Sequence, residues 1–272
     1  MKTESEYRQD IVEVGRRIWL RGFVAANDGN LSIRISENEV LATPTGVSKG
    51  FLTSDQIVKV DMEGNQMEGH LKASSEIAMH LEMYRQRCDV CAVVHAHPPV
   101  ATGFAVAGIP LDRPVLPEVV ISLGGIPLTP YAKPGTWELP EVIKPYLANH
   151  DAFLLANHGA LTLGADIYQA YYRMETLEHF AKISLVARQL GQENVLEPEA
   201  IEHLESVREQ MGLTFPRACR QCGACELGGG VRTPTPERLA EATGGNGFEE
   251  LDEATLTEII KRVAQRVIAQ VG

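Results

Sequence analysis

The chain has 272 residues, of which 44% are hydrophobic and 22% are charged, as is ordinary for a globular protein with a sizeable core. Its formal net charge of −11 argues against non-specific nucleic-acid binding and against a basic patch that docks on membranes. The first ten residues are polar, unlike a signal peptide, and no apolar run approaches the roughly 18 residues that span a bilayer. We therefore expect a cytoplasmic protein.

Periodicity predicts strands that alternate with helices along most of the chain. Ile11, Val14 and Ile18 recur at helical spacing, whereas residues 31–35 alternate apolar and polar side chains like a half-buried strand. The predicted helices cover about 5–21, 76–87 and 167–190, and the predicted strands cover 31–35, 40–42, 57–60, 91–95 and 152–156, with strand and loop at 121–131. This interleaving indicates an α/β domain.

The composition changes near residue 212, where glycine and proline become frequent. We expect residues 1–211 to form one domain, 212–250 to be a linker rich in Gly, Pro and Cys, and 251–272 to carry an amphipathic helix.

Three histidines stand at the ends of two predicted strands. His95 and His97 flank a single alanine, and residues two apart on a strand point to the same side. His158 follows the strand at 152–156. Three imidazoles that leave a fourth position open are typical of a catalytic zinc site, although each histidine alone would more often be structural. Together they favour a metal.

Glu76 is the candidate acid/base residue. It follows Ser74 and Ser75 at a predicted helix start, where the helix dipole favours a carboxylate. A purely structural acid is also common at that position. Glu76 is therefore a catalytic candidate only in combination with the other motifs. The other histidines have no partner spacing, and we interpret them as structural.

Five segments together carry a resemblance to a known family. They are Asn27-Asp-Gly-Asn-Leu-Ser-Ile-Arg34, Thr43-Pro-Thr-Gly46, Ser74-Ser-Glu76, His95-Ala-His97 and Asn157-His-Gly159. In order and spacing, over roughly residues 5–210, the chain resembles the class II aldolase/adducin family, in the branch of fuculose-1-phosphate aldolase and ribulose-5-phosphate 4-epimerase.

The resemblance implies a fold, an assembly and a site. The fold would be a three-layer α/β/α domain with a central, mainly antiparallel sheet, assembled as a C4-symmetric homotetramer with active sites at subunit interfaces. His95, His97 and His158 would bind Zn²⁺, although the same ligands accept Mn²⁺, Co²⁺ or Fe²⁺. Glu76 would be the acid/base. The residues that match phosphate-binding positions are Asn27, Asn30, Thr45, Gly46, Ser74 and Ser75.

One position departs from the aldolase pattern. The aldolase has a tyrosine six residues before a Gly-Gly turn, which reaches a neighbouring subunit's site and helps to protonate the aldehyde oxygen. Counting back from Gly124 gives Glu118 here. The methylthioribulose-phosphate dehydratase branch has a glutamate in this region, so the departure puts the second acid and the substrate in question.

The implied reaction is cleavage of L-fuculose or L-rhamnulose 1-phosphate to dihydroxyacetone phosphate and lactaldehyde. Lewis-acid stabilisation of the enediolate would accompany protonation by Glu76, and Glu118 or water would take the proton of the departing aldehyde. A 4-epimerase or a dehydratase would share this intermediate. A non-catalytic adducin-like scaffold is a further alternative, which the retained histidines and Glu76 argue against.

The C-terminal part carries two further features. Residues 251–271 form an amphipathic stripe that either packs on its own tetramer or docks on a partner, and it resembles the peptides that route enzymes to shell proteins of bacterial microcompartments. Cys219, Cys222 and Cys225 repeat a two-residue spacing that is compatible with a second metal site or with a redox-sensitive linker.

Overall fold

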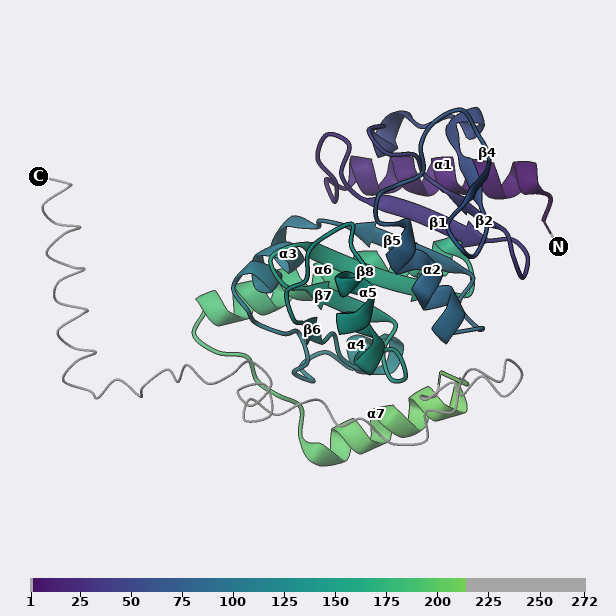
Figure 1. Ribbon diagram of the computed structural model, residues 1–272. Helices are drawn as coiled ribbons and strands as arrows, with labels where there is room; N and C mark the ends of the chain where they lie inside the picture. The colour runs from purple at the N-terminus through teal and green to yellow at the C-terminus, as the bar shows by residue number, and fades with distance from the viewer. Residues whose placement is uncertain (1, 214–272) are drawn as a thin grey trace, which may run out of the picture. The chain divides into compact units, whose positions relative to one another are not determined.

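The computed structural model describes residues 2–213 of the chain (Figure 1). The predicted linker with Cys219, Cys222 and Cys225, and the predicted helix at 251–272, lie outside the described residues. The domain boundary at residue 211 and the roles of those segments therefore stay predictions. None of the helices between residues 2 and 213 combines the length and apolar character that crossing a membrane requires.

Eight strands form one central sheet. Its spatial order is β4-β3-β2-β1-β5-β8-β7-β6, and every neighbouring pair is antiparallel except β6 with β7. The strands are β1 (Asn30–Arg34), β2 (Val40–Ala42), β3 (Val58–Val60), β4 (Gln66–Glu68), β5 (Ala92–Ala96), β6 (Leu128–Thr129), β7 (Ala152–Leu155) and β8 (Gly159–Gly164). The mainly antiparallel sheet expected above is confirmed.

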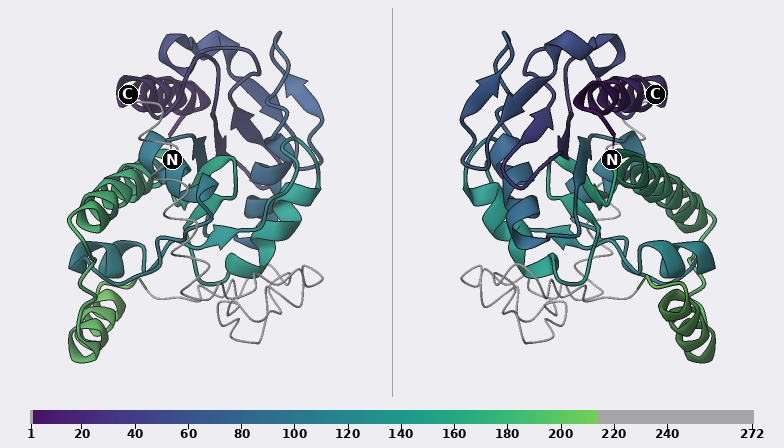
Figure 2. Two further views of the ribbon diagram at one scale, coloured as in Figure 1. Left: turned by 90° about the vertical axis from the view of Figure 1, so that its left-hand side faces the viewer. Right: turned by 90° about the vertical axis from the view of Figure 1, so that its right-hand side faces the viewer.

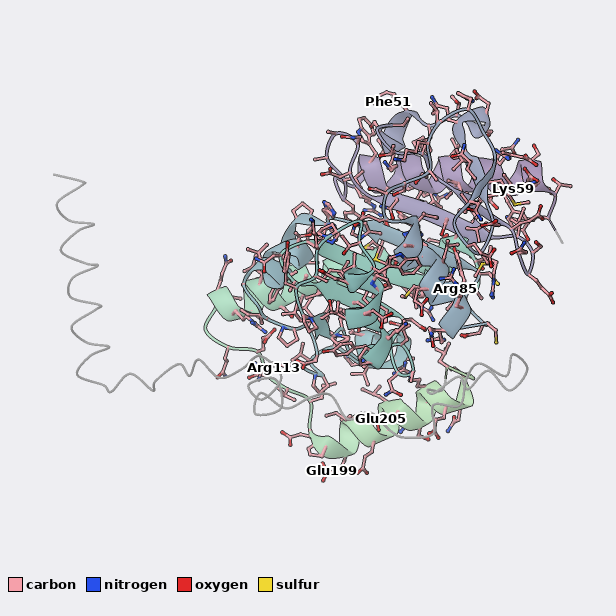
Figure 3. All side chains as sticks on the ribbon, in the orientation of Figure 1. Phe51, Lys59, Arg85, Arg113, Glu199 and Glu205 are labelled. Atoms are coloured by element: carbon pink, nitrogen blue, oxygen red, sulfur yellow. The ribbon has the colours of Figure 1, made fainter. Side chains whose placement is uncertain are left out.

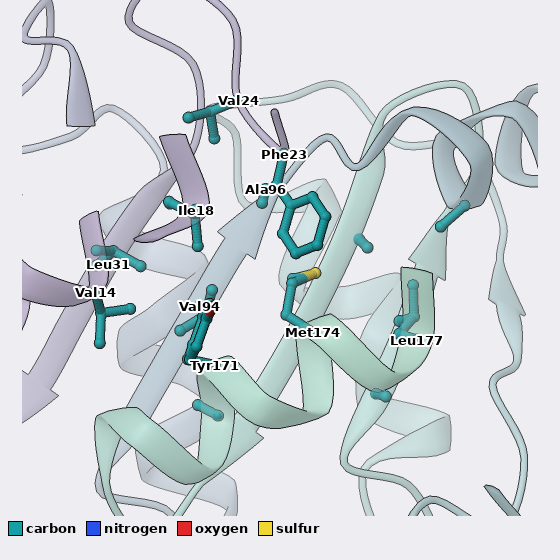
Figure 4. Close-up of a cluster of buried hydrophobic side chains, with 14 of the residues drawn as sticks. Val14, Ile18, Phe23, Val24, Leu31, Val94, Ala96, Tyr171, Met174 and Leu177 are labelled. Carbon is teal, nitrogen blue, oxygen red and sulfur yellow. The ribbon is translucent and has the colours of Figure 1, made fainter. Parts of the chain in front are cut away.

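Three helices cover one face of the sheet. They are α1 (Glu4–Leu20), α3 (Pro99–Val106) and α6 (Ile167–Gln189). Ile18 of α1 and Met174 of α6 are fully buried with Val94 of β5 in a single apolar cluster, and Figure 4 shows Phe23 pointing toward Met174 within it. Full burial of each such side chain stabilises the fold by about 1.5–3 kcal/mol.

The opposite face is covered by α2 (Ile77–Gln86) and by α5 (Glu138–Ile143), which continues into η3 (Lys144–Tyr146). Met83 of α2 and Ile143 of α5 are buried in a second cluster with Phe153 and Leu161 of the sheet. The views in Figure 2 show the sheet between its two helical layers, which confirms the three-layer α/β/α expectation.

The strand and loop predicted at 121–131 are correct only in their later part. Residues 117–122 form α4 (Pro117–Ser122), and β6 is the only strand in the range. Pro117 at the first helical position and Glu118 in the first turn both favour a helix start. The apolar run that follows them is too short for its period to tell a helix from a strand.

Several elements were not predicted. These are β4, β8, α3, α4, α5, the short helices η1 (Lys49–Phe51), η2 (Ser54–Gln56) and η3, and α7 (Pro198–Gln210). β8 is buried along its whole length but begins and ends in glycine. Glycine is typical of turns and loops, so the sequence pattern does not predict a strand there. Helix α7 packs against α4 without burying any of its residues, and Figure 3 shows Glu199 and Glu205 projecting from it.

A buried ion-pair cluster joins the end of α2 to β7 and α6. The Asp151 carboxylate lies 2.8 Å from the Arg87 guanidinium through Oδ1 and 2.6 Å from that of Arg173 through Oδ2. Arg87 also donates two hydrogen bonds of 2.8 Å to Asp89. We call these four residues the arginine–aspartate cluster. Its two positive and two negative side chains balance, so it ties the three elements together without a net buried charge.

Candidate metal centre and active site

The three histidines meet where β5 ends and β7 turns into β8. His95 is the fourth residue of β5, His97 follows that strand, and His158 lies in the turn before β8. His95 Nε2 and His97 Nε2 are 3.2 Å apart, and the His158 ring centroid lies 4.7 Å from that of His95. The two-residue spacing therefore does place His95 and His97 on the same side, as predicted from strand geometry.

Two glycines allow neighbouring backbone segments to lie close to the histidines. A Cβ atom on Gly159 would lie 2.5 Å from His97 Cδ2 and 2.7 Å from the Ala96 carbonyl oxygen, both far inside van der Waals contact. Gly29 has a φ of +72°, and a Cβ there would lie 2.8 Å from the His95 carbonyl oxygen. Only glycine fits both places without moving the backbone that carries the histidines.

Glu76 reaches the same point from the start of α2. Its Oε2 lies 3.4 Å from His95 Nε2, and its Oε1 lies 3.4 Å from His158 Nε2. Asn30 of β1 donates a 2.9 Å hydrogen bond from Nδ2 to Oε2, which holds the carboxylate over the imidazoles. The Glu76 side chain does not cap its own helix, so it is free to face the histidines.

These atoms have the spacing of a tetrahedral metal site. Zinc–nitrogen bonds of about 2.0–2.1 Å place neighbouring tetrahedral ligands about 3.3–3.4 Å apart. The separations of 3.2 Å between the nitrogens of His95 and His97 and of 3.4 Å from Glu76 to two imidazoles match that edge. One ligand atom from each of the three histidines lies within 4.8 Å of the others. The donor set fits a divalent metal.

Hydrogen bonding around the site affects which atoms can bind a metal. His95 Nδ1 lies 2.9 Å from the Ala160 carbonyl oxygen and donates to it, which directs the Nε2 lone pair toward the other histidines. His158 Nδ1 and Glu76 Oε1 are buried and have no hydrogen-bond partner within residues 2–213. A cation would give the Glu76 oxygen the partner that these residues do not supply.

Burial keeps two of the three histidines, His95 and His158, in the form that binds metals. Burial, followed by the neighbouring imidazoles of His158 and His97, lowers the pKa of His95 well below its usual 6.5. Burial also lowers the pKa of His158, against the opposing effect of the Glu76 carboxylate. Both side chains are therefore neutral at pH 7, as a ligand must be.

The predicted phosphate-binding residues fall on two loops that pair with each other. The Thr45 backbone N–H donates to the Lys72 carbonyl, and the Ser74 N–H donates to that of Thr43. This pairing brings Thr45 and Gly46 alongside Ser74 and Ser75. Gly46 has a φ of +75° with open space at its Cβ position, so its loop presents backbone to solvent as an anion cradle requires.

The other two predicted phosphate residues have different surroundings. Asn27 is exposed, whereas Asn30 is only 5% exposed, and the Asn30 amide group is engaged by Glu76. Asn30 Oδ1 is buried and lacks a partner among the residues that the structure describes.

Lys49 is a site-adjacent residue that the sequence did not reveal. It is 1% exposed, and its Nζ donates hydrogen bonds of 2.8 Å to the carbonyl oxygens of Asn27 and Val47. Burial lowers the pKa of Lys49 to about 8. Lys49 therefore clamps the loops that carry Asn27 and Gly46, a role that a lysine in a predicted loop does not signal.

His80, which its spacing predicts to be structural, is buried and lies one helical turn after Glu76. Its Nδ1 is 2.7 Å from Ser32 Oγ, and burial lowers the pKa of His80 to about 3. The four-residue spacing from Glu76 on a predicted helix was the available signal.

Glu118 lies apart from this centre. It is exposed on α4 and lines a hollow of about 540 Å³ together with Arg21, Glu175 and His179. None of the three clustered histidines is among the described residues that line this hollow. Within one chain, the structure does not bring Glu118 to the histidines.

Comparison with known proteins gives consistent matches. Residues 9–185 match the family model described as Class II Aldolase and Adducin N-terminal domain. Similar proteins include the 3-oxo-tetronate 4-phosphate decarboxylase of Escherichia coli K12, 34% identical over 189 residues that cover 68% of this chain and 89% of that one. The L-fuculose phosphate aldolase of Methanococcus maripaludis (strain DSM 14266) is 35% identical over 181 residues that cover 66% and 97%.

Solved structures agree with these sequence matches. An L-fuculose 1-phosphate aldolase structure, 30% identical, superposes with a TM-score of 0.71 and covers 77% of this chain and 98% of its own. The family model covers well over half of the chain and includes the three histidines and Glu76. The chain belongs to the class II aldolase and adducin family.

Proposed function

We propose that this chain is a metal-dependent lyase that cleaves L-fuculose 1-phosphate or L-rhamnulose 1-phosphate to dihydroxyacetone phosphate and lactaldehyde. The observation that carries the proposal is the Glu76 carboxylate, which lies 3.4 Å from two imidazole nitrogens of a three-histidine site. An acid/base residue beside a site that can hold a metal is the pairing that carbon–carbon cleavage next to a carbonyl needs.

Each group of residues has a separate task in this proposal. A divalent metal held by His95, His97 and His158, Zn²⁺ in our proposal, would supply Lewis acidity at the substrate carbonyl. Glu76 delivers a proton to the carbon that loses its bond, or removes that proton in the synthetic direction. Asn30 keeps one Glu76 oxygen engaged. The paired loops with Thr45, Gly46, Ser74 and Ser75 would hold the phosphate through hydroxyls and backbone N–H groups.

The proton on the departing aldehyde oxygen needs a second group. Glu118 is exposed and lies outside the histidine site of its own subunit, so we assign it to the site of a neighbouring subunit in a homotetramer. If the assembly leaves Glu118 distant from that site, water takes this proton.

Decarboxylation is the second candidate reaction. The relatives called 3-oxo-tetronate 4-phosphate decarboxylase match this chain at 34% identity, about as well as the aldolases do. A 3-oxo acid that loses carbon dioxide leaves an enolate, which the same metal site would stabilise and the same carboxylate would protonate. The two reactions differ in the leaving fragment, which is an aldehyde in one and carbon dioxide in the other.

One experiment separates the candidates. The zinc-loaded full chain is incubated with L-fuculose 1-phosphate, L-rhamnulose 1-phosphate and 3-oxo-tetronate 4-phosphate, with and without a chelator. Dihydroxyacetone phosphate and carbon dioxide are measured separately. Chelator-sensitive release of dihydroxyacetone phosphate from either ketose phosphate supports the aldolase. Release of carbon dioxide alone replaces it with the decarboxylase, and turnover of none of the three overturns the lyase proposal for these substrates.

We also propose that the C-terminal segment is a helix that docks on a partner protein. Residues 251–271 lie outside the described residues, and the proposal rests on their amphipathic pattern alone. Deletion of 250–272 is expected to preserve activity and the homotetramer while abolishing co-purification with a microcompartment shell protein. Loss of the tetramer on deletion would instead indicate that the segment packs on its own assembly.

A further inference from the structure

A buried polar seam lies between α2 and β1, directly behind the candidate active site. Glu76, His80 and Tyr84 are spaced four residues apart and form one stripe at the start and along the length of α2. Asn30 and Ser32 are two residues apart on β1 and so face the same side of the sheet. Asn30 contacts Glu76, and Ser32 contacts both His80 and Tyr84.

The seam contains a continuous hydrogen-bonded chain. Ser32 Oγ lies 2.6 Å from the Tyr84 phenol oxygen and 2.7 Å from His80 Nδ1. If Tyr84 donates to Ser32 and Ser32 donates to His80, Nδ1 is an acceptor and the imidazole carries its proton on Nε2. The His95 imidazole and the negatively charged Glu76 carboxylate are electrostatic neighbours of the His80 ring, and an anion is the partner that a proton on Nε2 would favour.

Two buried atoms in the seam are complementary and unpaired. His80 Nε2 has no hydrogen-bond partner among the described residues, and neither does Glu76 Oε1. One is a donor in the tautomer just described, and the other is a carboxylate oxygen with two acceptor sites, so it can receive this hydrogen and still face a cation held by the histidines. Buried polar atoms are rarely left without partners, and these two belong to residues one helical turn apart on the same face.

Building on the proposed function, we propose that His80 is a positioning residue for Glu76. The Tyr84–Ser32–His80 chain presents the Nε2–H group to one oxygen of Glu76, directly or through one buried water, while Asn30 holds the other oxygen. The carboxylate is thereby fixed in the orientation that proton transfer to the substrate carbon requires. Burial keeps His80 neutral, so the imidazole serves as a hydrogen-bond donor and not as a proton carrier.

Two amide substitutions of His80 distinguish the roles of its two ring nitrogens. The side-chain nitrogen of His80→Gln can occupy the place of Nε2, whereas the shorter side chain of His80→Asn can replace only Nδ1 and its contact with Ser32. Each variant is prepared as zinc-loaded full chain, and its zinc content and melting temperature are compared with wild type. The kinetic readouts are kcat, KM and the rate at which dihydroxyacetone phosphate exchanges its C3 proton with deuterated solvent.

The proposal predicts different losses for the two variants. His80→Asn is expected to lower kcat and the exchange rate about 100-fold with KM and zinc content unchanged, because displacement of a catalytic group by about 1 Å can cost that much. His80→Gln is expected to stay within about 10-fold of wild type, since a donor to Glu76 remains. Equal losses in both variants, or losses that follow zinc content or melting temperature, would overturn the positioning role.

A spectroscopic readout keeps this test independent of the substrate. Long-range ¹H–¹⁵N correlation spectra of histidine-labelled protein report which nitrogen of His80 carries the proton. A proton on Nε2, with a resonance that shifts in Glu76→Gln, supports the proposal even if no tested sugar phosphate is turned over, in which case only the proposed function fails. A proton on Nδ1 overturns the proposal whatever the activity.

Discussion

The molecule buries two clusters of polar side chains that differ in how their charges are paired. In the arginine–aspartate cluster, Asp151 lies within 2.8 Å of guanidinium groups on two sides, and Arg87 has a second carboxylate partner in Asp89. At the candidate active site, Glu76 contacts the neutral amide of Asn30 and the imidazoles of His95 and His158, whose pKa values are lowered by burial. Its Oε1 has no hydrogen-bond partner in the described part of the chain.

This difference separates a structural cluster from a functional one. The arginine–aspartate cluster pairs the Asp151 carboxylate with guanidinium groups of the same chain and connects α2, β7 and α6. The candidate site instead gathers electron-pair donors from three histidines and Glu76. Buried polar groups left unpaired by the fold mark places where a ligand completes the structure. We therefore expect changes in the first cluster to affect stability and changes in the second to affect chemistry.

The largest effect is expected from Glu76→Gln. The amide retains the size of the side chain and its contact with Asn30, but it cannot transfer a proton. We expect the rate to fall about 10²–10⁴-fold, the usual contribution of a positioned acid/base, while zinc content stays at wild-type level. Steady-state kinetics with parallel metal analysis checks this. Full activity in a zinc-loaded Glu76→Gln protein would remove Glu76 from the mechanism.

The next effect concerns the arginine–aspartate cluster. Asp151→Asn leaves two buried guanidinium groups without their shared counter-charge, and we expect the free energy of unfolding to fall by about 3–5 kcal/mol. Asp89→Asn is the matched control, and its smaller expected loss follows from the 27% exposure of the Asp89 side chain. Chemical denaturation measures both. If zinc binding by the folded Asp151→Asn protein weakened as much as its stability, the two clusters would not be separate.

A smaller effect is expected from Gly159→Ala. The new Cβ would collide with the Ala96 carbonyl and the His97 ring, so one imidazole must move. We expect zinc affinity to fall about 10–100-fold, as it does when the support of a ligand is lost. Gly103→Ala, in a helix with open space at its Cβ position, is the control and is expected to bind zinc normally. Competition with a chromophoric chelator measures the affinities, and equal affinities would mean that the loop adjusts freely.

The smallest effect is a pH dependence of stability from Lys49. Its pKa is about 8 in the folded chain against 10.5 for a free lysine, so the unfolded chain binds more protons between these values. Stability contributed by this residue therefore rises as pH increases through that window. Relative to Lys49→Met, we expect wild type to gain about 1–3 kcal/mol between pH 7.5 and 10.5. Melting temperatures across this range test the sign, and a flat difference would show that folding does not lower the pKa of Lys49.

Local sequence pattern was sufficient for the two long helices and for the side of β5 on which the first two histidines lie. The apolar period of three to four residues in α1 and the long uninterrupted run of α6 predicted both helices within a few residues. The two-residue spacing of His95 and His97 predicted that both side chains point the same way, because strand residues alternate faces. The family resemblance supplied the expectation of a three-layer fold, which the helices packed on both faces of the sheet confirm.

Only the tertiary structure decided which distant residues meet. Asn30 and Glu76 are 46 positions apart, and their hydrogen bond exists because β1 pairs with β5 while α2 packs across that pair. Lys49 gains its role from two carbonyl groups that the chain folds around it, and His80 from a serine on another element. Periodicity reports which side of its own element a residue faces. The partner on that side depends on strand order and packing, which are set by the whole chain and leave no local signal.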